Sequence, residues 1–148
     1  MRVYLDNCCY NRPYDNQSNI RIYLETEAKL HIQEMIKNRE LELVTSYMLY
    51  YENDKNRSLA KKQAIMNFIM ENESFYVGVE RSEDVNRLAA IVMQTGVKEK
   101  DAVHVTCAIM AQCSYFITTD DRLLKYTNDK IRLVTPCEFI RILEVNNT

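Results

Sequence analysis

The chain has 148 residues, a hydrophobic fraction of 47% and a charged fraction of 27%, which is the composition of a soluble globular protein. Its formal net charge of -2 excludes a protein whose whole surface attracts nucleic acid, so any such binding must be local. No stretch approaches the roughly 20 apolar residues of a membrane span. We therefore expect a single domain over residues 1–148, without a membrane partner.

The cysteine pattern bears on cellular location. Five cysteines, an odd number, include the adjacent Cys8 and Cys9 but no CxxC pair and no His-rich segment. Neither a disulfide framework nor a zinc–thiolate site is supported by this spacing. Reduced thiols in a cytoplasmic protein are the favoured interpretation.

The first predicted element is a buried strand that ends at an acid. The apolar run from Val3 to Leu5 stops on Asp6. Ligands of open α/β sheets bind outside the carboxyl ends of strands, so Asp6 stands where chemistry normally occurs. A lone aspartate there could equally cap the next turn. The polar residues 7–17, which include Pro13, predict a loop.

A long helix and a second strand follow. Ser18 or a neighbouring Asn is the predicted cap of a helix whose apolar residues recur on one side. The predicted stripe consists of Ile20, Leu24, Ala28, Ile32, Met35 and Ile36. Residues 41–45 predict a strand, Ser46 the cap of a helix over 47–51, and Glu52 comes directly after that run. An ordinary surface glutamate is the alternative for Glu52.

The middle of the chain predicts further helices, which begin at Ser58 and Ser82, with an extended segment over 75–79 between them and Gly96 as the cap that ends the second. Residues 98–111 predict a helix that is nearly all apolar after Asp101, and so is buried along most of its surface. Asp101 could compensate the dipole of that helix or belong to a site. His104, one turn later, could bond Asp101 or pack, and we do not assign it as a metal ligand.

The last third repeats the pattern of the first strand. Residues 115–119 predict a buried strand that ends at Asp120 and Asp121. A strand over 131–134 precedes Thr135 and Glu138, which predict a capping box for the final helix. Strands that alternate with helices predict an α/β fold with a largely parallel sheet covered on both faces.

Four acids can converge in such a fold: Asp6, Glu52, Asp101 and Asp120. Unpaired carboxylates in one cleft repel and raise one another's pKa values, so a bound dication is the simplest explanation for their grouping. Oxygen ligands favour Mg²⁺ or Mn²⁺ over zinc. With such a cation the expected substrate is a phosphate ester.

Four blocks of the sequence resemble the PIN domain of VapC-like ribonucleases, in the order and approximate spacing of that family. The blocks are VYLDNCCYNRP, LVTSYMLYYE, KEKDAVHVTCAI and YFITTDDRLL. The resemblance covers nearly the whole chain and implies a three-layer α/β/α sandwich with a mostly parallel sheet. It also implies an Mg²⁺- or Mn²⁺-dependent endoribonuclease, with Asp6, Glu52, Asp101 and Asp120 as the catalytic, metal-binding carboxylates.

The resemblance assigns supporting polar roles as well. Asn7 and either Thr118 or Thr119 are the supporting groups, and Asn7 stands where the family often carries a hydroxyl. Asp121 matches the family less well than Asp120, because the family acid is the first residue after the two threonines.

Three functions remain open from the sequence. The first is a ribonuclease that acts as the toxin of a toxin–antitoxin pair, with RNA as substrate, a small antitoxin as partner and a homodimer as a further expectation. The second is a non-catalytic PIN-fold scaffold or RNA-binding module. An aspartate-nucleophile phosphatase is disfavoured, because Cys8 stands where its second acid is needed.

Basic residues near these acids could bind phosphates at the rim of the cleft, although each could equally be solvated surface. They are Arg12, Lys55, Arg57, Lys98, Lys100, Arg122 and Lys125.

Overall fold

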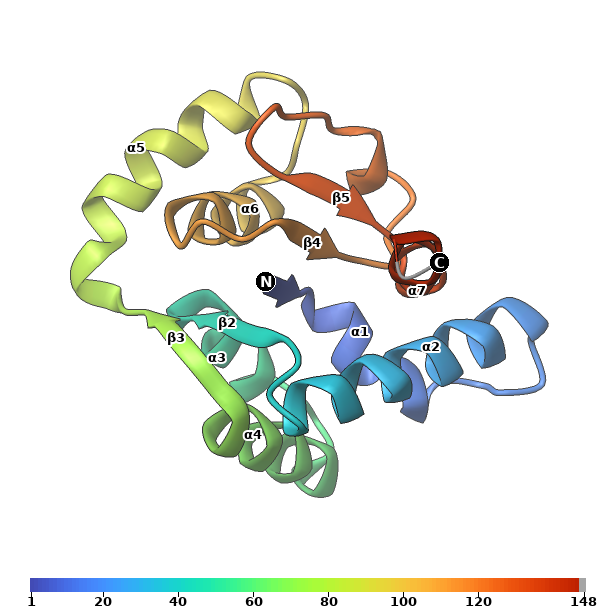
Figure 1. Ribbon diagram of the computed structural model, residues 1–148. Helices are drawn as coiled ribbons and strands as arrows, with labels where there is room; N and C mark the ends of the chain where they lie inside the picture. The colour runs from blue at the N-terminus through green and yellow to red at the C-terminus, as the bar shows by residue number, and fades with distance from the viewer. Residues whose placement is uncertain (147–148) are drawn as a thin grey trace.

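The computed structural model describes residues 1–146. Within this range, five parallel strands form one sheet in the order β3-β2-β1-β4-β5 (Figure 1). The strands are β1 (Arg2–Leu5), β2 (Glu42–Ser46), β3 (Glu73–Val77), β4 (Tyr115–Ile117) and β5 (Arg132–Val134). The predicted α/β class with a parallel sheet is confirmed. The predicted domain extends two residues beyond the described range.

Helices cover both faces of the sheet. They are α1 (Asn7–Asn11), α2 (Ile20–Lys37), α3 (Tyr47–Asp54), α4 (Leu59–Asn72), α5 (Ser82–Met93), α6 (Glu99–Met110) and α7 (Pro136–Asn146), with short 3-10 turns η1 (Arg12–Tyr14), η2 (Val79–Arg81) and η3 (Leu123–Lys125). Helices α5 and α6 lie on one side of the sheet, and α2, α4 and α7 lie on the other (Figure 1). This is the predicted three-layer sandwich.

Alternation along the strands separates two hydrophobic cores. In β1, Tyr4 points to the core under α5 and α6, whereas Val3 and Leu5 point to the core under α2, α4 and α7. In β4, Phe116 and Ile117 divide in the same way. Because successive side chains of a strand point to opposite faces, a sheet covered on both sides needs such continuous apolar runs.

The strand order creates a crevice next to β1. From β1 the chain moves outward to β2 and β3, and then returns to the other side of β1 for β4 and β5. Leu5 pairs with Ile117, and the Asp6 amide donates to the Ile117 carbonyl at 2.9 Å. The residues that follow β1 and β4 therefore lie side by side at the point where the order reverses, which is where open α/β sheets bind ligands.

The loop predicted over residues 7–17 is wrong in its first half. Residues 7–11 form α1, and the η1 turn with Pro13 follows directly. The Asp6 side chain accepts a hydrogen bond from the Asn7 amide and thereby caps α1. Polar composition suggested a loop, but Cys9 and Tyr10 are buried and attach this short helix to the core.

The predicted apolar stripe of α2 is only half right. Ile32 is fully buried, but Ile20 and Leu24 are 70% and 51% exposed. In this first half of α2 the buried side chains are Glu25 and Thr26, and the Glu25 carboxylate accepts from Arg12 Nε at 2.9 Å and Nη2 at 2.6 Å. Paired charges thus occupy the inner face where the helical spacing predicted apolar contacts.

Two helix ends also differ from the prediction. Helix α5 ends at Met93, so Gly96, which has a φ of 103°, lies in the turn beyond it and does not form the cap. At α7, Thr135 Oγ1 accepts from the Glu138 amide at 3.1 Å, as the predicted capping box requires. The Glu138 carboxylate, however, binds the Arg141 guanidinium at 2.7 Å, because the opposite charge one turn later is the stronger partner.

All five cysteines lie in the described range and carry free thiols; Cys9, Cys107 and Cys113 are buried. In the same range, no helix is both long enough and apolar enough to span a bilayer.

Candidate active site

The four predicted acids come from four separate segments and line one shallow pocket of about 350 Å³. Asp6 follows β1, Glu52 lies on α3 after β2, Asp101 lies in the first turn of α6, and Asp120 follows β4. The pocket is also lined by Asn7, Cys8, Asn11 and Asp15. The structure therefore brings together all four acids, at the carboxyl edge of the sheet.

Asp6 is 5% exposed and is fixed by hydrogen bonds to both carboxylate oxygens. Its Oδ1 accepts from the Asn7 amide at 2.8 Å, and its Oδ2 accepts from Thr118 Oγ1 at 2.8 Å. The thiol of Cys8 also approaches Oδ2, at 3.5 Å. The two roles considered for Asp6 coexist, since the residue caps α1 and forms a wall of the pocket.

Glu52 is oriented by a buried histidine. His104 Nε2 lies 2.5 Å from Glu52 Oε1, and Asn7 Nδ2 donates to Glu52 Oε2 at 3.3 Å. Burial alone would raise the pKa of Glu52, but the hydrogen bond and charge of His104 bring it below its usual value. Burial opposes the charged form of His104, and its contact with Glu52 and the other nearby acids still raises its pKa. The two groups therefore favour a charged pair.

The other ring nitrogen of His104 continues this chain of hydrogen bonds inward. Its Nδ1 lies 2.6 Å from the Tyr4 hydroxyl, which lies 2.6 Å from Ser46 Oγ. His104 and Tyr4 are fully buried, so the imidazole is held from both sides. The sequence left two roles open for His104: the bond to Asp101 is wrong, because the ring bonds Glu52, and packing is confirmed, because the side chain is fully buried.

Asp120 caps the turn that it begins. Its Oδ1 accepts from the Arg122 amide at 2.9 Å and the Leu123 amide at 3.4 Å. Its Oδ2 forms no hydrogen bond with any residue from 1 to 146. Asp121 turns away from the pocket and pairs with Arg21 at 2.8 Å on the exposed surface, in keeping with its weaker match to the family pattern.

Asp101 is the one of the four acids that has no partner among residues 1–146. Its carboxylate forms no hydrogen bond or ion pair within the described part of the chain, although the side chain is about half-buried. Burial raises its pKa, and the charges of Asp6, Asp120 and Glu52 raise it further, to about 6. The raised pKa thus comes first from burial and then from the neighbouring carboxylates, whose effect His104 offsets only in part.

The donor set can be compared with the needs of a metal ion. Across residues 1–146, no three His, Cys, Asp or Glu side chains already form a group that could hold one. The available donors are carboxylate oxygens, which Mg²⁺ and Mn²⁺ prefer, and burial together with the neighbouring acids raises the pKa of Asp101. The residues therefore suit such a cation in chemistry, and binding would need Asp101 and its neighbours to rotate toward it.

Several groups at this site were not found from the sequence. Tyr4 and Ser46 support His104, and Asp15 and Asn11 line the pocket. The available signal was the alternation of β1, which places Tyr4 on the sheet face opposite to Val3 and Leu5. Nothing in the sequence indicated that α6 would pack on that same face.

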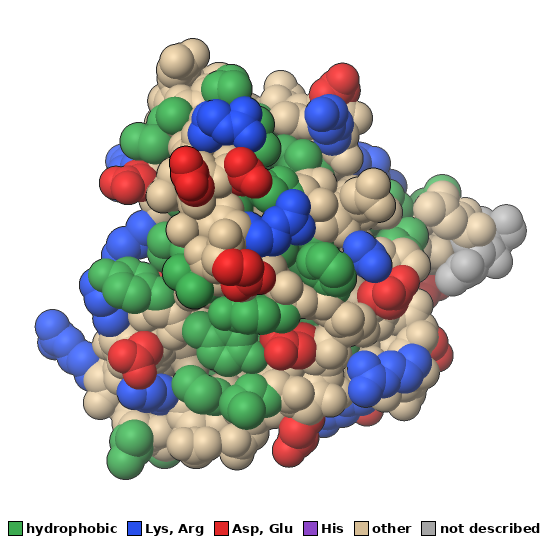
Figure 2. All heavy atoms as spheres, turned by 90° about the vertical axis from the view of Figure 1, so that its left-hand side faces the viewer, with side chains coloured by type: hydrophobic (Ala, Val, Ile, Leu, Met, Phe, Trp, Pro, Cys, Tyr) green, Lys and Arg blue, Asp and Glu red, His purple; other side chains and the backbone are tan. Residues whose placement is uncertain are grey.

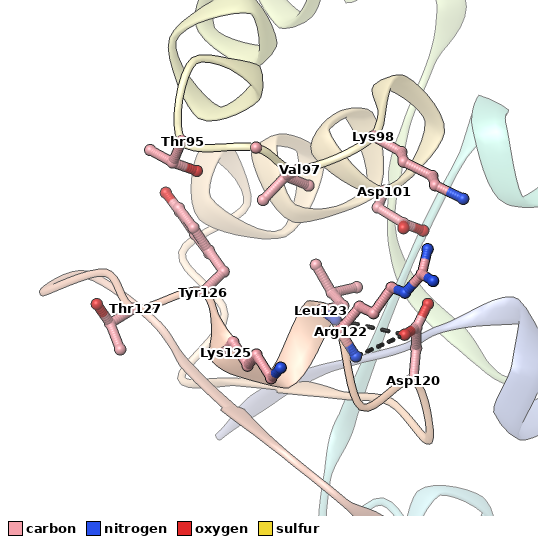
Figure 3. A pocket seen from close by; sticks show the side chains of 11 residues that line it. Thr95, Val97, Lys98, Asp101, Asp120, Arg122, Leu123, Lys125, Tyr126 and Thr127 are labelled. Carbon is pink, nitrogen blue, oxygen red and sulfur yellow. Dashed lines mark hydrogen bonds between the residues drawn. The ribbon is translucent and has the colours of Figure 1, made fainter.

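The basic residues that were predicted to rim the cleft separate into groups. Arg12 is engaged by Glu25 and Asp15, and Lys55 lies 4.3 Å from the centre of the Tyr51 ring. Lys98, Arg122 and Lys125 line a second pocket that adjoins the acids (Figure 3). On the face over α5 and β3, positive and negative side chains are interspersed with hydrophobic ones, and the positive side chains do not form a continuous basic patch (Figure 2).

The sequence and the structure were compared with those of known proteins, and only the structure has matches. No protein-family model and no curated protein sequence matches the chain. The crystal structure of VapBC2 from Rickettsia felis, bound to a DNA fragment from their promoter, matches with a TM-score of 0.54 and 15% identity. That of FitAcB from Neisseria gonorrhoeae matches with a TM-score of 0.56 and 12% identity. Each match covers 90% of this chain and 97% of the other.

The chain has a PIN-like fold. The matches extend over almost the whole of each chain, so the similarity involves the sheet and both helical layers. At identities of 15% and 12% it concerns the fold alone, and the PIN-like fold by itself assigns no activity.

Proposed function

We propose that this PIN-like protein is a metal-dependent endoribonuclease that hydrolyses RNA phosphodiester bonds with Mg²⁺ or Mn²⁺. The observation that carries the proposal is the convergence of Asp6, Glu52, Asp101 and Asp120 at the switch point of the sheet, around a carboxylate whose pKa is raised to about 6. Excess negative charge in a cleft repels a phosphate ester unless a cation is bound between them. A cation site and a phosphate substrate therefore explain the same feature.

The side chains divide the work of such a site. Asp6, Glu52 and Asp120 are held in place by Thr118, His104 and backbone amides, so their oxygens are oriented before a ligand arrives. Asp101 has no such hydrogen bond within the described part of the chain and can turn toward a cation. A divalent cation bound among them would supply positive charge for phosphate oxygens and an activated water for attack on phosphorus.

We also propose a protein partner, a small antitoxin that holds the enzyme inactive. The support is that the similar structures are the VapBC2 and FitAcB complexes, and that VapBC2 is bound to promoter DNA.

A second function is favoured by one observation. Because no three acids between residues 1 and 146 form a ready cation site, a PIN-like RNA-binding module without turnover would need no rearrangement. The two functions differ in whether RNA is cut.

The test is cleavage of an RNA pool by the purified protein with Mg²⁺, with Mn²⁺ and with a chelator, followed by mapping of the new ends. We expect cleavage only with metal, and a loss of several orders of magnitude in Asp101→Asn, which keeps the size of the side chain and removes its charge. Asp84→Asn is the matched control, since Asp84 is an exposed acid of α5 paired with Arg87. Binding of RNA without new ends would select the RNA-binding module, and equal cleavage by the wild type and a folded Asp101→Asn would contradict the assignment of Asp101.

A further inference from the structure

A larger pocket of about 430 Å³ adjoins the acidic pocket and shares Asp101 and Asp120 with it as a common wall. It lies between the turn of residues 95–98, which precedes α6, and residues 122–127, which follow Asp120 (Figure 3). Its volume falls in the range of small-ligand sites, about 300–1,000 Å³. Any chain that crosses the acids can therefore extend into this second pocket.

Three cations surround the second pocket. Lys98 is on one side, and Arg122 and Lys125 are on the other, where the Arg122 side chain extends toward Asp101 and Asp120 (Figure 3). None of the three side chains forms a hydrogen bond with another described residue, or an ion pair with an N–O distance of 4.0 Å or less. They differ in this from Arg12, whose guanidinium is held by Glu25 and Asp15. Unpaired cations beside a cleft are available to an anionic ligand.

Part of the pocket wall is apolar and aromatic, next to Thr95, Gly96 and Thr127. Leu123 is buried, and Val97 and Tyr126 are partly buried and pack against the core under α5 and α6. The Tyr126 ring and the Thr95 side chain point toward one another across the pocket (Figure 3). The Tyr126 hydroxyl accepts from Asn128 Nδ2 at 2.9 Å, which fixes the orientation of the ring. A partly buried ring of fixed orientation that lines a pocket is a surface on which a nucleobase can stack.

We propose that this pocket binds the nucleotide next to the scissile phosphate of single-stranded RNA, with its base against Tyr126 and its phosphate near Arg122, Lys98 and Lys125. The proposal deepens the proposed ribonuclease function and rests on it for the position of the scissile phosphate at the shared wall. Cations that served only to neutralise the acids would need no aromatic and apolar pocket beside them. A base paired in a duplex could not enter between Tyr126 and Thr95, which selects a single strand.

The first test is steady-state cleavage of the RNA identified in the pool by variants of the pocket. Base–aromatic stacking of about 1–3 kcal/mol corresponds to a factor of about 5 to 150, so Tyr126→Leu should raise KM within that range. Tyr126→Phe, which keeps the ring, should raise it far less. Lys125→Gln should raise KM and weaken its salt dependence, whereas Lys37→Gln, the same charge change on α2, should do neither. Equal KM values for Tyr126→Leu, Lys125→Gln and the wild type would overturn the proposal.

The second test does not depend on cleavage. Single-stranded decauridylate containing 5-iodouridine is crosslinked to the wild type by one UV pulse with Mn²⁺, and the product is digested with trypsin. We expect the crosslink at Tyr126, in the peptide of residues 126–130, and its loss in Tyr126→Leu. Crosslinks confined to other tyrosines of the ten in the chain, or none, would overturn the proposal. A crosslink at Tyr126 without RNA cleavage would uphold the pocket and reject the ribonuclease function, so the two failures are distinguishable.

Discussion

Asp101 differs from the other three acids in that the fold buries it among other carboxylates and gives it no compensating hydrogen bond or ion pair with any residue from 1 to 146. Its raised pKa means that the folded protein binds this proton more tightly than the unfolded chain does. Ionisation of Asp101 therefore lowers the free energy of unfolding. That loss begins near the unfolded pKa, about 3.9, and is complete above pH about 6, the folded value.

The resulting prediction concerns the metal-free protein. In chelator at pH 7 we expect Asp101→Asn to melt at a higher temperature than the wild type, and the difference to shrink as pH falls from 6 to 4. Asp121→Asn is the control of opposite sign, because Arg21 lowers the pKa of Asp121 and its neutral variant gains nothing. Thermal melts across this pH range measure both. A lower melting temperature for Asp101→Asn at pH 7 would show that its charge is compensated in solution.

His104 offers a second prediction at this scale. His104→Leu leaves Glu52 Oε1 without this partner and leaves the Tyr4 hydroxyl with Ser46 Oγ alone, and a buried polar group left unsatisfied costs about 1–3 kcal/mol. His104→Gln can still donate to Glu52 through its amide. We expect lower stability in both variants, and a fall in kcat at similar KM that the Gln variant partly restores. If stability falls but kcat per folded molecule is the same in both, His104 supports the core and does not position Glu52.

At the scale of the elements, the next prediction concerns the N-terminal cap of α7, which lies away from the site. Thr135 caps it, and loss of such a cap typically costs about 1 kcal/mol. Thr135→Ala should therefore melt slightly lower while activity per folded molecule is kept. Since the Glu138 carboxylate bonds Arg141 on an exposed face, Glu138→Gln should cost less than Thr135→Ala. The reverse order in denaturant unfolding would mean that the full capping box forms in solution.

The elements also show what the sequence could and could not predict. A strand that is buried on both faces appears in the sequence as a continuous run of apolar residues. Strands β1 and β4, and the acids that follow them, could therefore be predicted from apolar composition alone. Helix α1 was not, because its burial depends on packing of Cys9 and Tyr10 against distant residues. The Glu52–His104 contact joins residues 52 positions apart and Thr118 reaches Asp6 over 112, so neither could follow from local spacing. Apolar spacing also could not predict that Glu25 is buried by its pairing with Arg12 while Ile20 is exposed.

At the scale of the whole molecule, the sheet order explains why residues so far apart in the chain can form one site. Asp6 and Asp120 follow neighbouring strands whose connections leave in opposite directions, and α3 and α6 bring Glu52 and Asp101 to the same edge. The fold thus assembles four carboxylates, and among residues 1–146 only Glu52 has a cationic partner, His104. A ligand that neutralises them only in the folded state must stabilise the entire domain.

Divalent metal should therefore raise the melting temperature of the wild type. At a free concentration 100 times the dissociation constant the gain is about 2.7 kcal/mol, which corresponds to about 5 to 10 °C for a chain of this length. Asp101→Asn should shrink this shift, and it is the cleanest variant because Asp101 forms no hydrogen bond with the residues that the structure describes. Asp84→Asn, on the exposed surface of α5, should keep the full shift. The measurement is a set of thermal melts of the three proteins in chelator and then in Mn²⁺. An equal shift in all three proteins would place the cation elsewhere on the molecule. The absence of any shift in the wild type would contradict a shared metal site, because carboxylates that repel one another in the metal-free protein cannot bind a dication without a gain in stability.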